Sequence, residues 1–170
     1  MTLARITGWL GFIALLAGAV RMLMTPASLI WGTDSLPELA AGYAGCVLMA
    51  IGSIGLMLGQ SQKAGIWGFI GSLLMAVGNI FTSSLVWTTL FKTITEPSQT
   101  FLMINNIVML LGFVIFSLIS IRVNVYPRWA SILLLVSPLI SMIPMFGDYF
   151  ALMWGLAYVA FGYQIWKART

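Results

Sequence analysis

Four carboxylates are the side chains of this chain best suited to acid–base or cation-binding chemistry. The sequence has no histidine, so the commonest general base and the commonest metal ligand are both missing. Its single cysteine, Cys46, lies within an apolar run, which leaves neither a disulfide framework nor a cysteine metal site. No nucleophile or base accompanies the carboxylates in the sequence. We therefore expect no enzyme, no metal site and no cofactor. The four acids are Asp34, Glu38, Glu96 and Asp148.

The positions of these acids favour a structural role. Ser35 and Glu38 have the spacing of a helix capping box, while Glu96 and Asp148 each come just before an apolar segment. Negative charge is favourable at a helix N-terminus, where the helix dipole is positive. We expect the acids to cap helices. The alternative is a carboxylate pair, Asp148 with Asp34 or Glu38, that closes a site on the outer side.

Polar residues inside the apolar segments are the other candidates. Side-chain amides are costly to leave unpaired in lipid, so they must face other helices or a wet cavity. Most of these residues fall in the half of the membrane that we expect to face outward. Two interpretations stay open: hydrogen bonds that hold helices together, or a polar pocket open to the outside and covered by residues 25–37. The candidate ligand-binding residues are Asn79, Ser83, Asn105, Asn106, Trp31 and Asp148.

Composition indicates which elements position these residues. The chain of 170 residues is 61% hydrophobic and only 7% charged, whereas a soluble domain has about 25% charged residues. A membrane helix needs about 20 apolar residues. The sequence therefore predicts an all-α integral membrane protein, a single transmembrane domain over residues 1–170 with six helices. Their expected ranges are 6–24, 39–58, 65–91, 101–121, 129–146 and 149–166.

Charge placement orients this bundle by the positive-inside rule. With both termini cytoplasmic, Arg21 and Lys92 are outside together with all four acids, and we expect no Lys or Arg to be buried in mid-helix. Tryptophans fall near both predicted boundaries, as interfacial belts require. We expect a multi-pass protein of the plasma membrane. The basic residues on the inner side are Arg5, Lys63, Arg122, Arg128, Lys167 and Arg169.

Glycine is concentrated in residues 42–79, which hold nine of the 17 glycines. In a bilayer small residues let helix backbones approach closely. The polar residues 60–63 interrupt this stretch and predict a tight turn. We expect the second and third helices to form a hairpin, with the glycine face of the second helix packed against the third.

Two functions remain open from the sequence. The first is a small-molecule binding or transport component with its site in the outer half. The second is a non-catalytic accessory or assembly subunit of a membrane complex. In helix number, length and orientation the predicted bundle is similar to the substrate-binding subunits of energy-coupling-factor importers, a likeness of architecture without a shared motif.

Partners follow from the same features. We expect the lipid bilayer, a small-molecule ligand, and a membrane partner subunit or a second copy of the chain, but no nucleic acid. The small-residue pairs Ala14/Gly18 and Ala40/Ala44 are candidates for docking a partner helix. Cleavage of the first helix as a signal peptide is the alternative to its retention.

Overall fold

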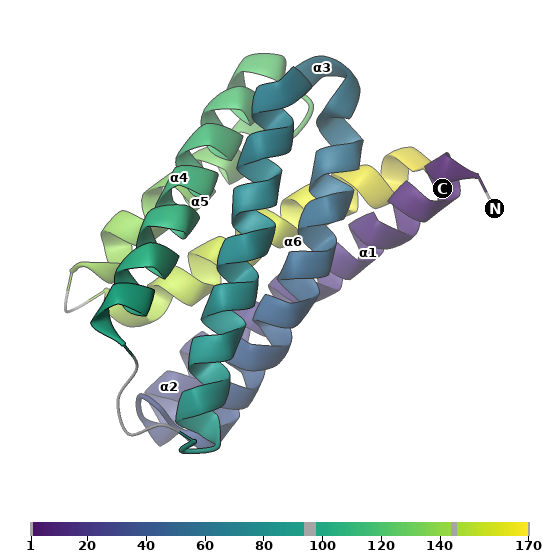
Figure 1. Ribbon diagram of the computed structural model, residues 1–170. Coiled ribbons are helices and arrows are strands. Elements are labelled where there is room, and N and C mark those ends of the chain that lie inside the picture. The colour runs from purple at the N-terminus through teal and green to yellow at the C-terminus, as the bar shows by residue number, and fades with distance from the viewer. Residues whose placement is uncertain (1, 94–97, 144–145, 170) are drawn as a thin grey trace.

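The computed structural model describes residues 2–93, 98–143 and 146–169, apart from the side chains of Asp148 and Arg169. The described residues form helices and no strand (Figure 1), which confirms the all-α class. The elements are α1 (Leu3–Met22), α2 (Met24–Trp31), α3 (Leu36–Leu90), α4 (Gln99–Val123), α5 (Arg128–Ser141), the 3-10 turn η1 (Gly147–Tyr149) and α6 (Phe150–Arg169).

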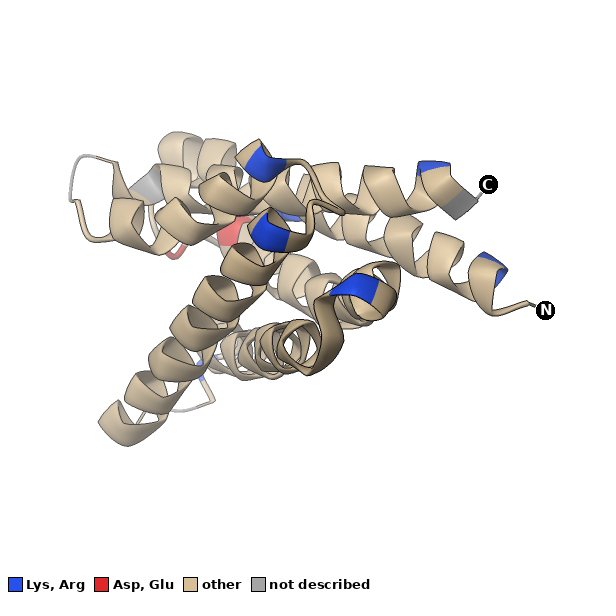
Figure 2. Ribbon diagram, turned by 90° about the horizontal axis from the view of Figure 1, so that it is seen from above, with Lys and Arg blue, Asp and Glu red and all other residues tan. Residues whose placement is uncertain are grey.

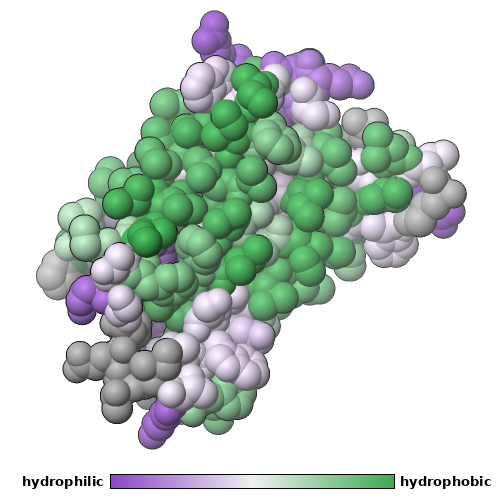
Figure 3. All heavy atoms as spheres, in the orientation of Figure 1, coloured by the Kyte–Doolittle hydropathy of each residue, from purple (hydrophilic) through white to green (hydrophobic). Residues whose placement is uncertain are grey.

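Three helical stretches among the described residues are long and apolar enough to cross a membrane. They are Leu3–Trp31, Leu36–Leu90 and Gln99–Val123. Their outward side chains are largely apolar, and Figure 3 shows hydrophobic residues covering most of one face between more polar ends. Helix α5 has only 14 residues, fewer than the roughly 20 that a perpendicular span needs. The six-span count and the cytoplasmic termini therefore stay predictions.

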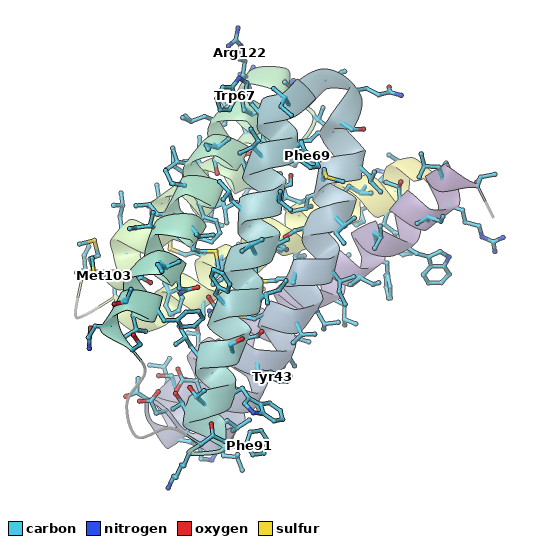
Figure 4. The ribbon with its side chains drawn as sticks, in the orientation of Figure 1. Tyr43, Trp67, Phe69, Phe91, Met103 and Arg122 are labelled. Carbon is cyan, nitrogen blue, oxygen red and sulfur yellow. The ribbon has the colours of Figure 1, made fainter. Side chains whose placement is uncertain are left out.

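Helix α3 reverses direction at Gly65. This residue has φ 55° and ψ −151°, a conformation that L side chains rarely adopt and that glycine reaches without strain. The two arms, residues 36–64 and 66–90, run back beside each other. Their far ends meet where the rings of Tyr43 and Trp87 lie 5.3 Å apart, and both the reversal and this lower end are visible in Figures 1 and 4. The glycine-rich segment is a hairpin.

The glycines of the first arm do not face the second arm, so that expectation is wrong. A Cβ placed on Gly52 would lie 2.8 Å from Ala14 Cα, and one on Gly55 would lie 2.8 Å from Leu10 Cβ. Both neighbours belong to α1. In the second arm, a Cβ on Gly71 would lie 2.7 Å from the backbone nitrogen of Phe116 in α4. These glycines of each arm thus pack against a helix outside the hairpin. The prediction failed because a helical wheel shows which face of a helix is small but not which neighbouring helix covers that face.

Helix α1 also packs closely along α6. A Cβ on Gly155 would lie 2.5 Å from the carbonyl oxygen of Gly18, so the two backbones touch. Gly18 is buried in this contact, and Ala14 is buried in the contact with α3. The Ala14/Gly18 pair is therefore used inside the molecule and is not free to dock a partner helix, whereas Ala40 and Ala44 are exposed.

The segment expected as a loop over residues 25–37 is partly helical. Helix α2 follows α1 after Leu23, whose φ of −65° and ψ of −18° keep the chain helical. The described hydrogen bonds at the start of α3 are not those of the expected capping box. Glu38 accepts a hydrogen bond from the Asp34 backbone N–H at 2.7 Å, but the Ser35 hydroxyl makes no cap hydrogen bond. Asp34 has φ 60°, which turns the chain so that Glu38 reaches Asp34 instead of Ser35. Glu96 lies outside the described residues.

Candidate functional site

A cavity of about 500 Å³ lies among α4, α5 and α6, at the end of the bundle away from Gly65. Met103, labelled in Figure 4, lies about one turn before the cavity residues of α4. The volume falls within the usual range for small-molecule sites, roughly 300–1,000 Å³. Its walls come from five helices, with a single residue each from α1 and α3. The lining residues are Arg21, Thr82, Asn105, Asn106, Met109, Leu110, Phe113, Ser137, Pro138, Leu139, Ser141, Met142, Phe150 and Trp154.

Arg21 is buried in this wall, with only 2% of its surface exposed. The expectation that no Lys or Arg is buried in mid-helix is therefore wrong, whereas the expected position of Arg21 on the outer side stays a prediction. The guanidinium carbon lies 4.4 Å from the centre of the Trp154 ring and 5.5 Å from that of Phe150. The reason is that α2 continues the helical path beyond Arg21, so this residue is not at the end of its helical stretch.

The Arg21 guanidinium has few hydrogen-bond partners. Nη1 donates to the carbonyl oxygen of Gly42 at 3.4 Å and contacts the sulfur of Cys46 at 3.2 Å. Nε is buried and has no partner. A guanidinium offers five N–H donors in a planar fork, so most of its capacity is unused by the side chains and backbone that the structure describes.

No described carboxylate balances this charge. The acids with described side chains are Asp34 and Glu38, and neither forms an ion pair with Arg21. Glu96 and the side chain of Asp148 lie outside the described part of the chain, so the predicted pairing of Asp148 with another acid is untested. A buried charge without a counter-charge is costly, and a ring face offsets part of that cost.

Trp154 places a second unpaired donor in the same wall. Its side chain is 3% exposed, and the indole Nε1 is buried without a hydrogen-bond partner. The indole packs against Phe113, with ring centres 5.1 Å apart. Arg21 Nε and Trp154 Nε1 are thus two unsatisfied N–H groups on residues that line one cavity, and neither side chain can accept a hydrogen bond.

Asparagines of α4 supply further polar groups. Asn105 is buried, and its Oδ1 accepts a hydrogen bond from Thr82 Oγ1 at 3.1 Å. This bond joins the second arm of α3 to α4 and fixes the amide oxygen. Asn106 is exposed and lies at the edge of the cavity. Of the predicted site residues whose side chains the structure describes, Asn105 and Asn106 line the cavity.

The α5 wall contains a proline whose effect on the backbone is compensated locally. Pro138 has no N–H to donate to the carbonyl oxygen of Leu134, one turn earlier. The hydroxyl of Ser137 donates to that oxygen instead, at 2.9 Å. Ser137 is fully buried and Pro138 lines the cavity. The pair keeps α5 helical beside an open space.

The cavity opens between α4 and α5. Its inner wall is buried at Met109, Phe113 and Trp154, while Leu110 and Leu139 lie exposed on the lining. Met142 is the most exposed of the lining residues, at 78%. The mouth therefore combines these three exposed apolar residues with exposed Asn106 and Ser141.

The other predicted site residues with described side chains lie elsewhere, and the side chain of Asp148 is outside the described part of the chain. Asn79 is in the core, where its Nδ2 donates to Met75 O at 2.8 Å and to the Tyr158 hydroxyl at 3.4 Å. The Tyr158 hydroxyl also pairs with Ser53 at 2.8 Å. Asn79 thus joins helices instead of lining the cavity. Ser83 donates to its own helix, and Trp31 is 61% exposed at the end of α2.

Sequence reasoning missed Arg21 and Trp154 as site residues. The signal for Arg21 is that apolar residues continue past it for ten positions, to Trp31, with a single proline among them. Trp154 lies one turn inside the predicted outer end of the last helix, deeper than an interfacial tryptophan needs to be. Neither signal shows that the two side chains meet, since they belong to helices far apart in the sequence.

A second cavity, of about 460 Å³, lies at the opposite end of the bundle. It gathers the beginning of α1 at Leu3, the α3 turn at Lys63, the α4–α5 connection at Asn124 and the end of α6 at Ala168. Seen from this end, Figure 2 shows several Lys and Arg positions. Gln60 is buried here and its Oε1 accepts a hydrogen bond from Ser120 at 3.0 Å.

Metal chemistry has no evident ligand set in the described residues. No three His, Cys, Asp or Glu residues of that part of the chain lie close enough to share a metal ion. The groups that the Arg21 cavity offers are hydrogen-bond donors, amides and apolar side chains. Comparison with known proteins adds no assignment: the chain matches no protein-family model, no curated protein and no solved structure.

Proposed function

We propose that this chain is a multi-pass protein of the plasma membrane that binds a small molecule in the Arg21 cavity, as a binding or transport component. The observation that carries the proposal is a cavity of ligand size whose wall holds the buried, unpaired groups of Arg21 and Trp154. Buried donors without partners are rare in folded proteins, and a ligand that accepts hydrogen bonds would satisfy them.

The proposal includes six spans with both termini cytoplasmic. In its support, the beginning of α1, the α3 turn, the α4–α5 connection and the end of α6 all line the second cavity. In a six-span chain, two crossings separate each of these points from the next, so all four lie on the same side of the membrane. Lys63, Arg122 and Arg128 lie at or beside that end, and such residues favour the cytoplasmic side. The Arg21 cavity then lies in the outer half.

Cysteine labelling tests the orientation. Cys46 is fully buried, so added cysteines at exposed positions can be read above a low background. We expect Thr33→Cys to react with a membrane-impermeant maleimide in intact cells, and Gln62→Cys to react only after permeabilisation. The reverse pattern would contradict the orientation, and equal labelling of both would contradict an odd number of crossings between them.

A blocking variant tests binding in the cavity. Asn106→Trp places a large ring at the cavity edge, and Ile107→Trp places the same ring on the exposed surface of α4 outside the lining. The purified protein in neutral detergent is screened by thermal shift against neutral, cationic and anionic small molecules. We expect at least one class to stabilise the wild type and Ile107→Trp but not Asn106→Trp. Stabilisation by no class, or equal stabilisation of both variants, would contradict the proposal and favour an accessory subunit.

A further inference from the structure

We infer that the ligand of this cavity is an anionic amphiphile. Its headgroup, a carboxylate or phosphate, lies against Arg21 and Trp154, and its apolar chain leaves between α4 and α5. The inference rests on the proposed function and names the chemical class of its ligand.

Charge is the first argument. Arg21 is 2% exposed, and neither carboxylate with a described side chain pairs with it. Its polar contacts are a carbonyl oxygen and a sulfur, both neutral groups. An anion is the ligand that offsets a buried positive charge, whereas a cationic ligand would add a second uncompensated charge.

Hydrogen-bond capacity is the second argument. Arg21 Nε and Trp154 Nε1 can only donate, and both are unsatisfied. Carboxylate and phosphate oxygens only accept when ionised, and the arginine fork matches their geometry. The two donors lie on residues in direct contact, since the guanidinium carbon is 4.4 Å from the Trp154 ring centre. Both N–H groups are themselves buried, so one headgroup in the cavity reaches both only after the two side chains turn toward it.

The route out of the cavity is the third argument. Leu110, Leu139 and Met142 line it and are exposed on the hydrophobic surface. A small hydrophilic anion would meet exposed Asn106 and Ser141 there, but it would gain nothing from the three apolar residues. An acyl chain would instead remain in contact with apolar side chains and then with lipid, while only the headgroup enters the wall.

Two sources can supply this chemistry, a free fatty acid or an anionic phospholipid. The test uses palmitate, its uncharged analogue hexadecanol, and nanodiscs of phosphatidylglycerol or phosphatidylcholine. Thermal stabilisation is measured for the wild type, for Arg21→Gln and for the control Arg122→Gln, which removes an exposed arginine at the opposite end (Figure 4).

We expect palmitate or phosphatidylglycerol to stabilise the wild type and Arg122→Gln, and the neutral partner of each pair to stabilise neither. Arg21→Gln should weaken binding of the anion by about tenfold or more, because a charge-assisted pair is lost. Trp154→Phe keeps an aromatic ring and removes only the Nε1 donor, so it should weaken the same binding severalfold. This variant decides the question if Arg21→Gln does not fold.

The outcomes separate the two proposals. Stabilisation by palmitate alone identifies a free acid as the source, and stabilisation by phosphatidylglycerol alone identifies a lipid headgroup. Equal stabilisation by palmitate and hexadecanol, blocked by Asn106→Trp, would overturn the anionic class and leave binding in the cavity intact. Anion binding that Trp154→Phe and Arg21→Gln both leave unchanged would also overturn the inference.

Discussion

Two sides of the bundle differ in how closely their helices approach. On one side, α1 lies against α6 and the first arm of α3, with backbones touching at Gly18, Gly52 and Gly155. On the other side, α4 and α5 diverge around the Arg21 cavity. Close packing leaves no space and tolerates no added atom. The open side has space and contains the unpaired N–H groups of Arg21 and Trp154. In our proposal, the close side supports the fold and the open side binds the ligand.

Arg21 lies between the closely packed side of the bundle and the side that contains the cavity. Its backbone belongs to the close contact, where a Cβ on Gly45 would lie 3.2 Å from Arg21 Cα. Its side chain leaves that contact and enters the open side. The close packing thus fixes the position of the charge, and the cavity gives it a place where a ligand can reach it.

Enlarging a residue in the close contact should have the largest effect. In Gly18→Leu the new side chain would meet the Gly155 carbonyl and the Val159 backbone nitrogen. Overpacking costs about 1–3 kcal/mol and more where backbone is the obstacle. We expect little folded protein in size-exclusion chromatography. The matched control Ala19→Leu, at an exposed position of the same helix, should fold normally. Equal yields of the two variants would show that the contact is not close.

Removing the buried charge should have the opposite sign in ligand-free protein. Arg21→Met keeps an unbranched side chain and replaces a buried charge by an apolar group. Replacing even a buried ion pair by apolar side chains is often neutral or stabilising by about 1–4 kcal/mol. We expect its midpoint of thermal unfolding in neutral detergent to equal or exceed that of the wild type. A clear loss of stability would show that Arg21 is held by a counter-charge within the protein.

The α5 wall allows a double-mutant cycle. Ser137→Ala leaves the Leu134 carbonyl oxygen without its donor and should cost about 1 kcal/mol of unfolding free energy. In a Pro138→Ala background the backbone N–H is restored, so the same serine change should cost almost nothing. Equal costs in both backgrounds, measured by denaturant unfolding, would show that the hydroxyl does not compensate for the proline.

The hydrogen bond between α3 and α4 should have the smallest effect. Thr82→Val removes the donor to Asn105 Oδ1, and interhelical hydrogen bonds in membrane proteins average about 0.6 kcal/mol. We expect a small decrease in the unfolding midpoint. Thr89→Val is the control, since its hydroxyl bonds only within its own helix. A larger loss in the control would contradict a role for Thr82 in joining the helices.

Much of the fold could be predicted from the sequence because its signals are local. The apolar runs located most of the helices. The polar residues 60–63 predicted the reversal of α3 close to its position, although these four residues are helical and the chain turns at Gly65. Partner choice could not be predicted. A helical wheel of the first arm of α3 shows a glycine face, which either α1 or the second arm could cover. In the structure, α1 covers most of it.

The cavity was predictable only in part. Asn105 and Asn106 stood out because amides in an apolar segment need partners, and both line it. Asn79 carried the same signal, but its Nδ2 donates hydrogen bonds in the core and its Oδ1 is buried there without a partner. Arg21 was assigned to the aqueous side because the positive-inside rule counts a charge near the end of an apolar run. The continuation of that helix as α2 depends on packing that no local pattern shows.

The most direct test is an experimental structure of the protein in phosphatidylglycerol nanodiscs with palmitate added. The predicted result is a ligand in the cavity, with a headgroup oxygen within hydrogen-bond distance of Arg21 Nε or Trp154 Nε1 and an apolar chain leaving between α4 and α5. A cavity without ligand, with the Arg21 guanidinium paired to a carboxylate of the protein itself, would contradict it.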